Sequence, residues 1–236
     1  MFKVKPIIIA HVGAHSGEEA ESYLELEWLD TYWFEANPNM ITVLRENPDV
    51  ENSKIIMRAI TDTSNKKVWL NIASSSMSSS IFAFEKHSKI YPSIKMQESV
   101  EVTTMRLDDF FQDFTPDFIN LDIQGSELLA LKGAQNILEK VKWIYTEVSF
   151  KDLYKNGAKV GDIDVFLSRY GFIRSGTRRL FGEGWGDALY INSNYFKLPF
   201  RNRFLEKVNS AIWVNSQITY QIRLRAHNLL RGERRS

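Results

Sequence analysis

The stretch PIIIAHVGAHSG, residues 6–17, decides the fold of this chain. It begins as an apolar run and ends in a short loop bounded by Gly13 and Gly17, and the segment 18–28 that follows has a helix-like composition. A buried strand, a glycine-rich turn and the start of a helix are typical of the opening of a nucleotide-binding α/β sheet. Eighteen residues after Gly17, a second apolar run ends in Glu35, about where such folds place an acid on ribose hydroxyls.

The spacing of the two glycines separates two kinds of cofactor. A dinucleotide site has the pattern Gly-x-Gly-x-x-Gly, which lets the backbone approach a pyrophosphate at a helix N-terminus. Here Gly13 and Gly17 are four residues apart, and no third glycine lies in register. S-adenosylmethionine (SAM) has no phosphate and needs a loop against which an amino-acid tail and a sulfonium can lie. The pattern favours SAM over NAD; the alternative is an ordinary α/β turn in which Glu35 caps a helix or is paired at the surface.

The composition is that of a globular protein with one main domain. The 236 residues suit one α/β domain with additions, or at most two small domains. Apolar residues make up 44% and charged residues 25%, and a chain of this size can bury a large core without a metal or disulfide. Cysteine is absent, which excludes disulfides, cysteine catalysis and thiolate metal sites and fits a cytoplasmic protein. No apolar run reaches the roughly 18 residues of a membrane span, and residues 6–12 are expected to form the first strand rather than a signal peptide.

Charge divides the chain into an acidic body and a basic tail. From residue 197 on there are nine Lys or Arg and two Glu, a net charge of +7, which leaves −6 on residues 1–196. Apolar residues in the tail recur in steps of four and predict one or two amphipathic helices. We expect residues 1–196 to form the domain and residues 197–236 a helical extension. That extension packs on the domain or on a second copy, or contacts an anionic surface such as the inner face of the membrane.

Apolar runs alternate with helix-period stretches, which predicts an α/β fold with a largely parallel sheet. The expected strands are residues 7–12, 32–35, 54–60, 67–71, 100–105, 118–122, 143–148, 172–174 and 188–191. The expected helices are residues 18–29, 38–46, 125–139 and 162–170.

A second informative segment is DFINLDIQGSE, residues 117–127, in which a strand ends at Asp122 and a turn leads into a helix. Ligands of open α/β sheets bind beyond the carboxyl ends of the strands. His11, Glu35, Asp122 and Glu147 all stand at such ends, so we expect them to surround one site.

Two further segments are candidates for acceptor binding. The serine-rich stretch 74–80, with Ser79 and Ser80, is either a flexible loop or a lid over the site. Trp185 lies between two glycines, and Asp187 follows the second of them. An aromatic face beside a carboxylate is typical of sugar sites; the alternative is a tight turn filled by the aromatic side chain. His15 and His87 lie in loops, where histidine is either a surface residue or a base, and no histidine pair has the spacing of a helical zinc site.

Taken together, the motifs resemble the FkbM family of SAM-dependent methyltransferases. The matching pieces occur in the family's order and span about residues 7–192. They are HVGAHSGEE (11–19), WFEANP (33–38), RAITD (58–62), SSSI (78–81), RLDD (106–109), NLDIQGSE (120–127), LKGA (131–134) and GWGD (184–187). The resemblance implies a Rossmann-like class I methyltransferase fold, a mainly parallel seven-stranded sheet with an antiparallel last strand.

The resemblance also implies O-methylation, often of sugar or polyketide hydroxyls, and it gives the site residues roles. Gly13 and Gly17 would line the methionine part of SAM, Glu35 would hold the ribose hydroxyls, and Asp122 would lie by the methyl group. The candidate cofactor contacts are, in full, His11, Gly13, His15, Gly17, Glu35, Ala36, Ala59, Ile60, Asp122 and Gln124.

Two positions depart from the family pattern. Many members carry Asp-Val-Gly-Ala where this chain has His11, and Asp-x-Glu-Gly where it has Gln124. Each departure removes an acid, which disfavours a two-carboxylate metal site and leaves Asp122 and Glu147 as the main candidates. Participation of a divalent metal stays open, and no metal ligand is assigned.

We therefore expect a SAM-dependent O-methyltransferase acting on a hydroxyl, such as that of a sugar in a polysaccharide, glycolipid or natural product. A sugar hydroxyl is a poor nucleophile at neutral pH, so a base should take its proton: Asp122 or Glu147 first, His87 or His15 second. The acceptor is a small molecule or glycan held by Ser79, Ser80, Trp185 and Asp187, and nucleic acid is not expected because the body is acidic. The alternatives are a non-catalytic binding protein on a methyltransferase scaffold and a nicotinamide-dependent oxidoreductase.

Overall fold

The computed structural model describes residues 7–24, 29–73, 79–82, 96–152, 154, 157–179 and 184–195. The expectations for the basic tail, for His87 and for residues 74–78 lie outside these ranges. Within them, no helix has the length and apolar character needed to cross a membrane.

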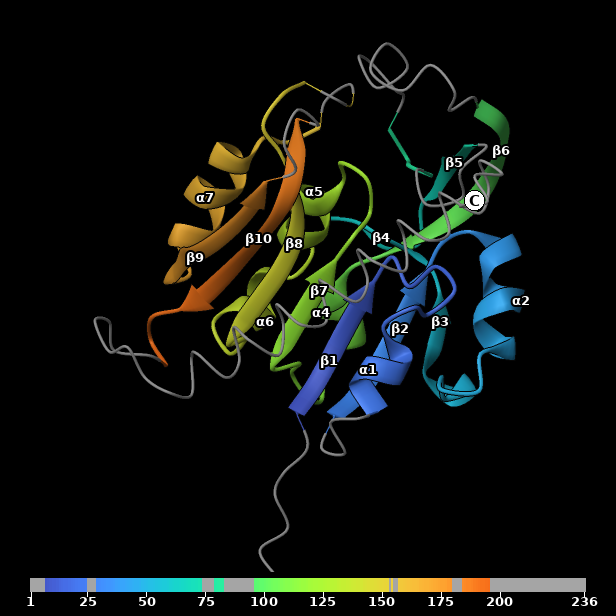
Figure 1. Ribbon diagram of the computed structural model, residues 1–236, viewed down its shortest axis with the longest axis horizontal. Helices are drawn as coiled ribbons and strands as arrows, with labels where there is room; N and C mark the ends of the chain where they lie inside the picture. The colour runs from blue at the N-terminus through green and yellow to red at the C-terminus, as the bar shows by residue number, and fades with distance from the viewer. Residues whose placement is uncertain are drawn as a thin grey trace, which may run out of the picture.

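A seven-stranded sheet forms the centre of the domain, with the order β3-β2-β1-β7-β8-β10-β9 (Figure 1). Its strands are β1 (Ile7–Val12), β2 (Leu29–Glu35), β3 (Ile55–Met57), β7 (Phe118–Leu121), β8 (Trp143–Ser149), β9 (Phe172–Arg179) and β10 (Trp185–Asn192). Neighbours from β3 to β8 pair in parallel, whereas β10 is antiparallel to both β8 and β9. The expected mainly parallel sheet with an antiparallel last strand is confirmed.

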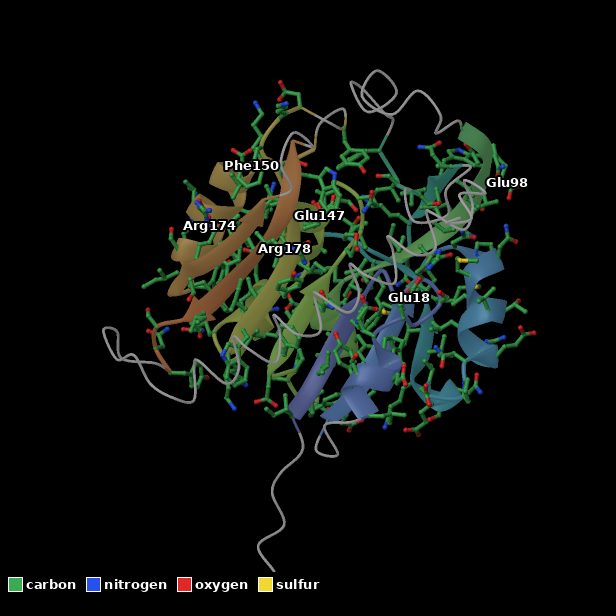
Figure 2. All side chains as sticks on the ribbon, viewed as in Figure 1. Glu18, Glu98, Glu147, Phe150, Arg174 and Arg178 are labelled. Atoms are coloured by element: carbon green, nitrogen blue, oxygen red, sulfur yellow. The ribbon has the colours of Figure 1, made fainter. Side chains whose placement is uncertain are left out.

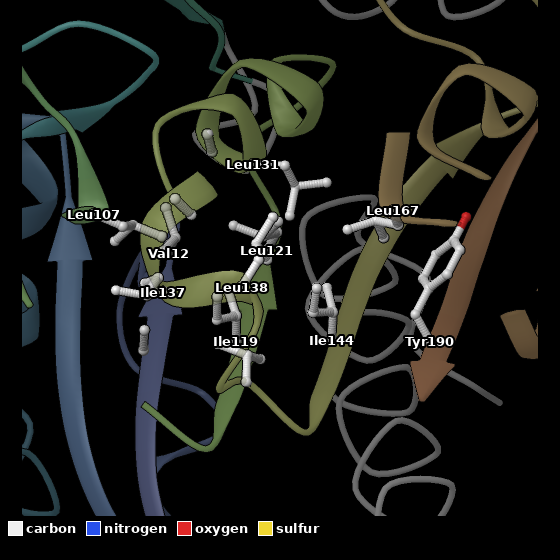
Figure 3. Packing of buried hydrophobic residues seen from close by; sticks show 14 of the residues in the cluster. Val12, Leu107, Ile119, Leu121, Leu131, Ile137, Leu138, Ile144, Leu167 and Tyr190 are labelled. Atoms are coloured by element: carbon white, nitrogen blue, oxygen red, sulfur yellow. The ribbon is translucent and has the colours of Figure 1, made fainter. Parts of the chain in front are cut away.

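Helices cover both faces of this sheet, which explains why its central strands are mostly apolar. On one face lie α4 (Leu107–Phe110), α5 (Glu127–Lys132), α6 (Gln135–Leu138) and α7 (Val160–Ser168), whose apolar residues form the largest core cluster with Ala10, Val12, Ile119 and Leu121 (Figure 3). On the other face α1 (Ala20–Leu24) and α2 (Pro38–Glu46) pack on Ile9 and Trp33. Full burial of each large aliphatic side chain stabilises the fold by about 2 kcal/mol.

A small second sheet, which the periodicity did not predict, stands beside the first. Its order is β4-β6-β5, with β4 (Ala59–Ile60), β5 (Lys67–Ala73) and β6 (Met96–Met105). Residues 54–60 were expected as one strand, but after the short 3-10 turn Asn52–Lys54 they divide between the two sheets. The amide of Arg58 donates to the carbonyls of Glu35 and Ile56 at 3.1 Å each, and the chain then leaves β2 and pairs with β6. Apolar periodicity reports burial but not the partner strand, so this division is invisible in sequence.

Two expected helices are shorter in the structure. The segment 125–139 forms α5 and α6, which part at Gly133, whose amide closes α5 by donating to the carbonyls of Leu129 and Ala130. A side chain at Gly133 would place its Cβ 2.0 Å from the carbonyl oxygen of Thr61, so the chain passes here too closely for any other residue. The first helix was expected over 18–29, but α1 begins at Ala20, its described part is Ala20–Leu24, and Leu29 already belongs to β2.

Candidate active site

The glycine loop after β1 joins the ends of three strands. Amides of Gly13 and Ala14 donate to the carbonyl of Phe34 at 2.9 and 3.0 Å, which ties the loop to β2. Gly13 has φ +86°, and a Cβ there would lie 1.9 Å from the carbonyl oxygen of Asp122, at the end of β7. Only glycine permits this conformation and approach, so Gly13 brings the loop, β2 and β7 together.

The carboxylate of Glu35 closes the far side of the loop. One of its oxygens accepts from the amide of His15 and the other from the amide of Asn37, both at 2.7 Å. The side chain is buried, and burial raises the pKa of Glu35 although the two amide hydrogen bonds oppose the shift. Each oxygen can accept a second hydrogen bond, so Glu35 can still receive a pair of hydroxyls from the pocket that it lines.

His15 and Glu18 form an ion pair at the mouth of the loop. The His15 Nδ1 lies 2.7 Å from Glu18 Oε1, and Ser16 also contacts this ring nitrogen at 3.2 Å. Burial acts to raise the pKa of Glu18, but the hydrogen bond and charge of His15 outweigh it and lower the pKa to about 2. With its ring engaged by Glu18, His15 is poorly placed to serve as a base.

A pocket opens above these strand ends, with about 790 Å³ of empty space including its open mouth. The predicted residues that line it are Gly13, His15, Glu35, Ala36, Ala59, Ile60, Ser79, Ser80, Asp122 and Gln124. Further lining residues, which the sequence analysis did not single out, are Glu18, Glu19, Arg58, Leu70, Ile81 and Ser126. The topology therefore brings most of the predicted cofactor residues to one cavity at the carboxyl ends of β1, β2 and β7.

His11 and Gly17 take other places. His11 is buried beneath the loop, where its Nδ1 lies 3.2 Å from the hydroxyl of Tyr23 and its Nε2 3.7 Å from a carboxylate oxygen of Glu19. Along β1 its side chain points to the same face as Ile9, toward α1, and it is not among the residues that line the pocket. Gly17, with φ +74°, packs over Leu44, where a Cβ would approach to 2.9 Å.

Beside the pocket, the Gln124 amide joins two carboxylates, Asp122 and Glu147. Gln124 Nε2 donates to Asp122 Oδ1 at 2.8 Å and to Glu147 Oε2 at 3.0 Å. Its Oε1 accepts from the hydroxyl of Tyr154 at 2.7 Å. Glu147 is buried at the end of β8 and reaches the pocket only through Gln124, whereas Asp122 lines it directly.

Glu127, at the start of α5, is a third carboxyl group behind this pair. Its Oε1 accepts from the amides of Gly125 and Ile123 at 3.0 and 3.2 Å. Burial, helped by the nearby charge of Asp122, raises the pKa of Glu127 to about 7, although the amide hydrogen bonds lower it. Glu127 is therefore largely protonated below neutral pH and adds little negative charge to the site there.

Trp185 and Asp187 lie on the neighbouring part of the sheet and do not line the pocket. Asp187 stands opposite Glu147 of β8 on one side and Arg178 of β9 on the other, so the three side chains share one face. Figure 2 shows Glu147 and Arg178 over the β8–β10–β9 part of the sheet. His87 lies outside the described residues.

Tyr154 was missed because no sequence pattern marks it. It lies outside every helix and strand of the structure, yet is buried against Gly125, where a Cβ would come within 2.5 Å of its ring. Arg58 had a signal, since it opens the RAITD motif, but its reach into the pocket depends on the turn between β3 and β4.

The pocket suits SAM and not a dinucleotide. Glu18, Glu19, Glu35 and Asp122 line it against the one guanidinium of Arg58, an acidic balance that favours a cationic ligand and repels a pyrophosphate. Glu35 would hold the ribose hydroxyls, the Gly13 loop the amino-acid tail, and Ala59 and Ile60 the adenine. Within the part of the chain described, no three His, Asp or Glu side chains gather so as to hold a metal ion.

The class of protein follows from three features: the order of the strands in the sheet, the glycine loop after β1 and the acid-lined pocket. Together they define a Rossmann-like SAM-dependent methyltransferase. Comparison with known families matches residues 11–174 to the methyltransferase FkbM domain. The chain belongs to this family of enzymes. The two alternative hypotheses, an oxidoreductase and a non-catalytic binding protein, are therefore set aside.

The individual proteins to which the chain is similar have low sequence identity to it. The 2-O-methyltransferase NoeI of Sinorhizobium fredii is 27% identical over 170 residues, which cover 65% of this chain and 67% of that protein. Among solved structures, a TehB-like SAM-dependent methyltransferase from Corynebacterium glutamicum is 11% identical with a TM-score of 0.42, covering 80% of this chain and 82% of its own. The magnesium protoporphyrin IX methyltransferase of Synechocystis, solved with bound SAM, is 12% identical with a TM-score of 0.42, covering 81% and 72%.

Proposed function

We propose that this enzyme transfers the methyl group of SAM to a hydroxyl oxygen of a saccharide. The observation that carries the proposal is the Asp122 carboxylate, which lines the pocket and is held by Gln124. A hydroxyl needs a base for its proton, whereas most nitrogen and sulfur acceptors do not need a dedicated carboxylate. The similarity to NoeI, a 2-O-methyltransferase, supports oxygen as the acceptor atom.

Bound SAM supplies a methyl group on a positively charged sulfur. Glu35 and the Gly13 loop fix the position of the cofactor. Asp122 receives the proton of the acceptor hydroxyl while the oxygen of that hydroxyl takes the methyl group. Holding the oxygen in line with the methyl, with water excluded, provides most of the acceleration. Glu147 supports Asp122 through the Gln124 amide, which lies between the two carboxylates. No step assigned to these residues needs a metal.

The acceptor side of the site is formed by two groups of residues. Ser79 and Ser80 border the pocket, and Ser80 Oγ is held by the carbonyl of Gln124 at 2.7 Å. Trp185 and Asp187 lie beyond Glu147 on the same sheet face. An aromatic ring beside a carboxylate suits a pyranose, whose faces are apolar and whose edges carry hydroxyls.

We extend the proposal to the arrangement of the whole chain. Residues 1–196 form the catalytic domain, and the basic segment 197–236 packs on that domain or on a second copy, or brings the enzyme to an anionic surface such as the inner face of the membrane. Nucleic acid is not a partner.

The experiment incubates the purified chain with methyl-labelled SAM and a panel of mono- and oligosaccharides, with a lysine-rich protein and an RNA as nitrogen-acceptor controls. We expect label on a saccharide, resistant to base and located on oxygen by mass spectrometry. Asp122→Asn should lose at least about a hundredfold in turnover while still binding S-adenosylhomocysteine in calorimetry. Asp113→Asn, at an exposed position away from the pocket, is the matched control. Label on nitrogen, or full turnover by Asp122→Asn, would refute the proposal.

A further inference from the structure

The side chain of Gln124 makes three hydrogen bonds to its neighbours in the site. Its two amide hydrogens go to Asp122 and Glu147, and its oxygen accepts from Tyr154. The orientation of the amide is fixed by chemistry, because ionised carboxylates only accept hydrogen bonds and the Tyr154 hydroxyl has a proton to give. Reversing the amide would place its oxygen against two negative charges.

The backbone at Gln124 is unusual for this residue type. It has φ +54°, in the left-handed region that glycine or asparagine adopts more readily. Its own carbonyl is held by Ser80 Oγ, and the next residue, Gly125, lies against the ring of Tyr154. Contacts on each side therefore hold the strained turn in the one geometry that aims the amide between the carboxylates.

The charges around Gln124 are almost all negative. Asp122 directly follows β7, Glu147 lies near the end of β8, and Glu127 begins α5 behind them. Burial first, and then the charges of Glu147, Glu127 and Asp122, raise the pKa of Tyr154 well above its ordinary value, so its hydroxyl keeps its proton. On the neighbouring strands, Asp187 of β10 is in register with Glu147 of β8 and with Arg178 of β9, so an acid and a cation share this sheet face with Glu147.

We propose that Gln124 is a positioning residue whose amide bridges Asp122 and Glu147, with Tyr154 locking the amide in place. The bridge offsets the repulsion between the two carboxylates and aims Asp122 at the acceptor. This inference rests on the proposed function, in which Asp122 takes the acceptor proton.

The decisive variant is Gln124→Glu, which keeps the shape of the side chain but replaces its amide, and both amide hydrogens, with a carboxylate. In buffer with EDTA we expect turnover at pH 8 to fall about tenfold or more, with the affinity for S-adenosylhomocysteine within about threefold of the unmodified enzyme. As the pH is lowered to 6 the new carboxyl gains a proton and can donate again. The ratio of variant to unmodified turnover should then rise about tenfold, a change that a purely structural defect would not produce.

A second readout needs no turnover. The melting temperature of unliganded Gln124→Glu should fall relative to the unmodified protein as the pH rises from 6 to 8, because the introduced carboxylate then ionises beside Asp122, Glu147 and Glu127. Gln112→Glu, at an exposed position, is the matched control and should show no such trend. Tyr154→Phe, which removes only the hydroxyl, should lower kcat about threefold or more without changing the KM for SAM.

The outcomes separate the two proposals. A loss of activity in Gln124→Glu that is the same at pH 6 and 8, or a melting temperature without pH dependence, would overturn the amide bridge. Failure of the unmodified protein to methylate any hydroxyl would overturn the proposed function instead, and the melting data would still test the bridge. If Gln124→Glu does not fold, an unchanged kcat in Tyr154→Phe would refute the locking of the amide.

Discussion

Replacement of Glu127 by glutamine should make the protein more stable above neutral pH. Glu127 is 4% exposed, and burial with the nearby charge of Asp122 raises its pKa to about 7 from an ordinary value of 4.5. Between these values the folded state holds a proton that the unfolded state has released. The stabilisation associated with Glu127 is therefore complete below pH 4.5 and is lost as the pH rises through 7.

The size of the stability change follows from the shift in the pKa of Glu127. At about 1.4 kcal/mol for each pH unit, a pKa raised from 4.5 to about 7 costs the folded state about 3 kcal/mol by pH 8. Glu127→Gln removes this cost, because the amide does not ionise. Its oxygen can still accept from the amides of Gly125 and Ile123, which Glu127 Oε1 now accepts.

Urea denaturation of both proteins at pH 5 and pH 8 measures the effect. We expect near-equal free energies of unfolding at pH 5 and a gain of about 2–3 kcal/mol for Glu127→Gln at pH 8. Burial also raises the pKa of Glu35, but that contribution is common to both proteins and cancels in the difference. A difference that is the same at both pH values would refute the reasoning, since it would mean that Glu127 does not titrate between them.

Three further predictions concern the loop and the pocket. Gly13→Ala should lower the free energy of unfolding by about 3 kcal/mol, because a Cβ would lie 1.9 Å from the Asp122 carbonyl oxygen at a φ of +86°; an unchanged melting curve would contradict this. Glu35→Gln should weaken S-adenosylhomocysteine binding at least about tenfold in calorimetry, because one backbone amide would then face an NH2 group; equal affinity would show that the ribose is held elsewhere. In Glu18→Gln the His15 ring should lose its charged partner, and an NMR titration should show the pKa of His15 falling; an unchanged titration would mean that the ion pair does not form in solution.

Local sequence patterns were sufficient to predict the central strands of the sheet and helix α2. Apolar runs bounded by glycine or an acid correctly marked β1, β2, β7 and β8, because these strands are buried on both faces and their composition is set by burial alone. The boundaries of α2 were predicted to the residue, since Pro38 and Asn47 start and end it by local backbone chemistry. Residues 54–60 and 125–139 were mistaken for single elements because a strand's partner and the close approach of Gly133 to Thr61 are non-local.

By itself, the sequence determined the class of fold, the family and the kind of cofactor pocket, because a glycine loop after a buried strand and an acid after the next must meet at one edge of a parallel sheet. Only the tertiary structure decided which side chains enter that pocket. His11 turns to the α1 face because side chains alternate along β1, and Tyr154 reaches Gln124 from a segment with no pattern of its own. Side-chain direction depends on register and on distant packing, and neither is encoded locally.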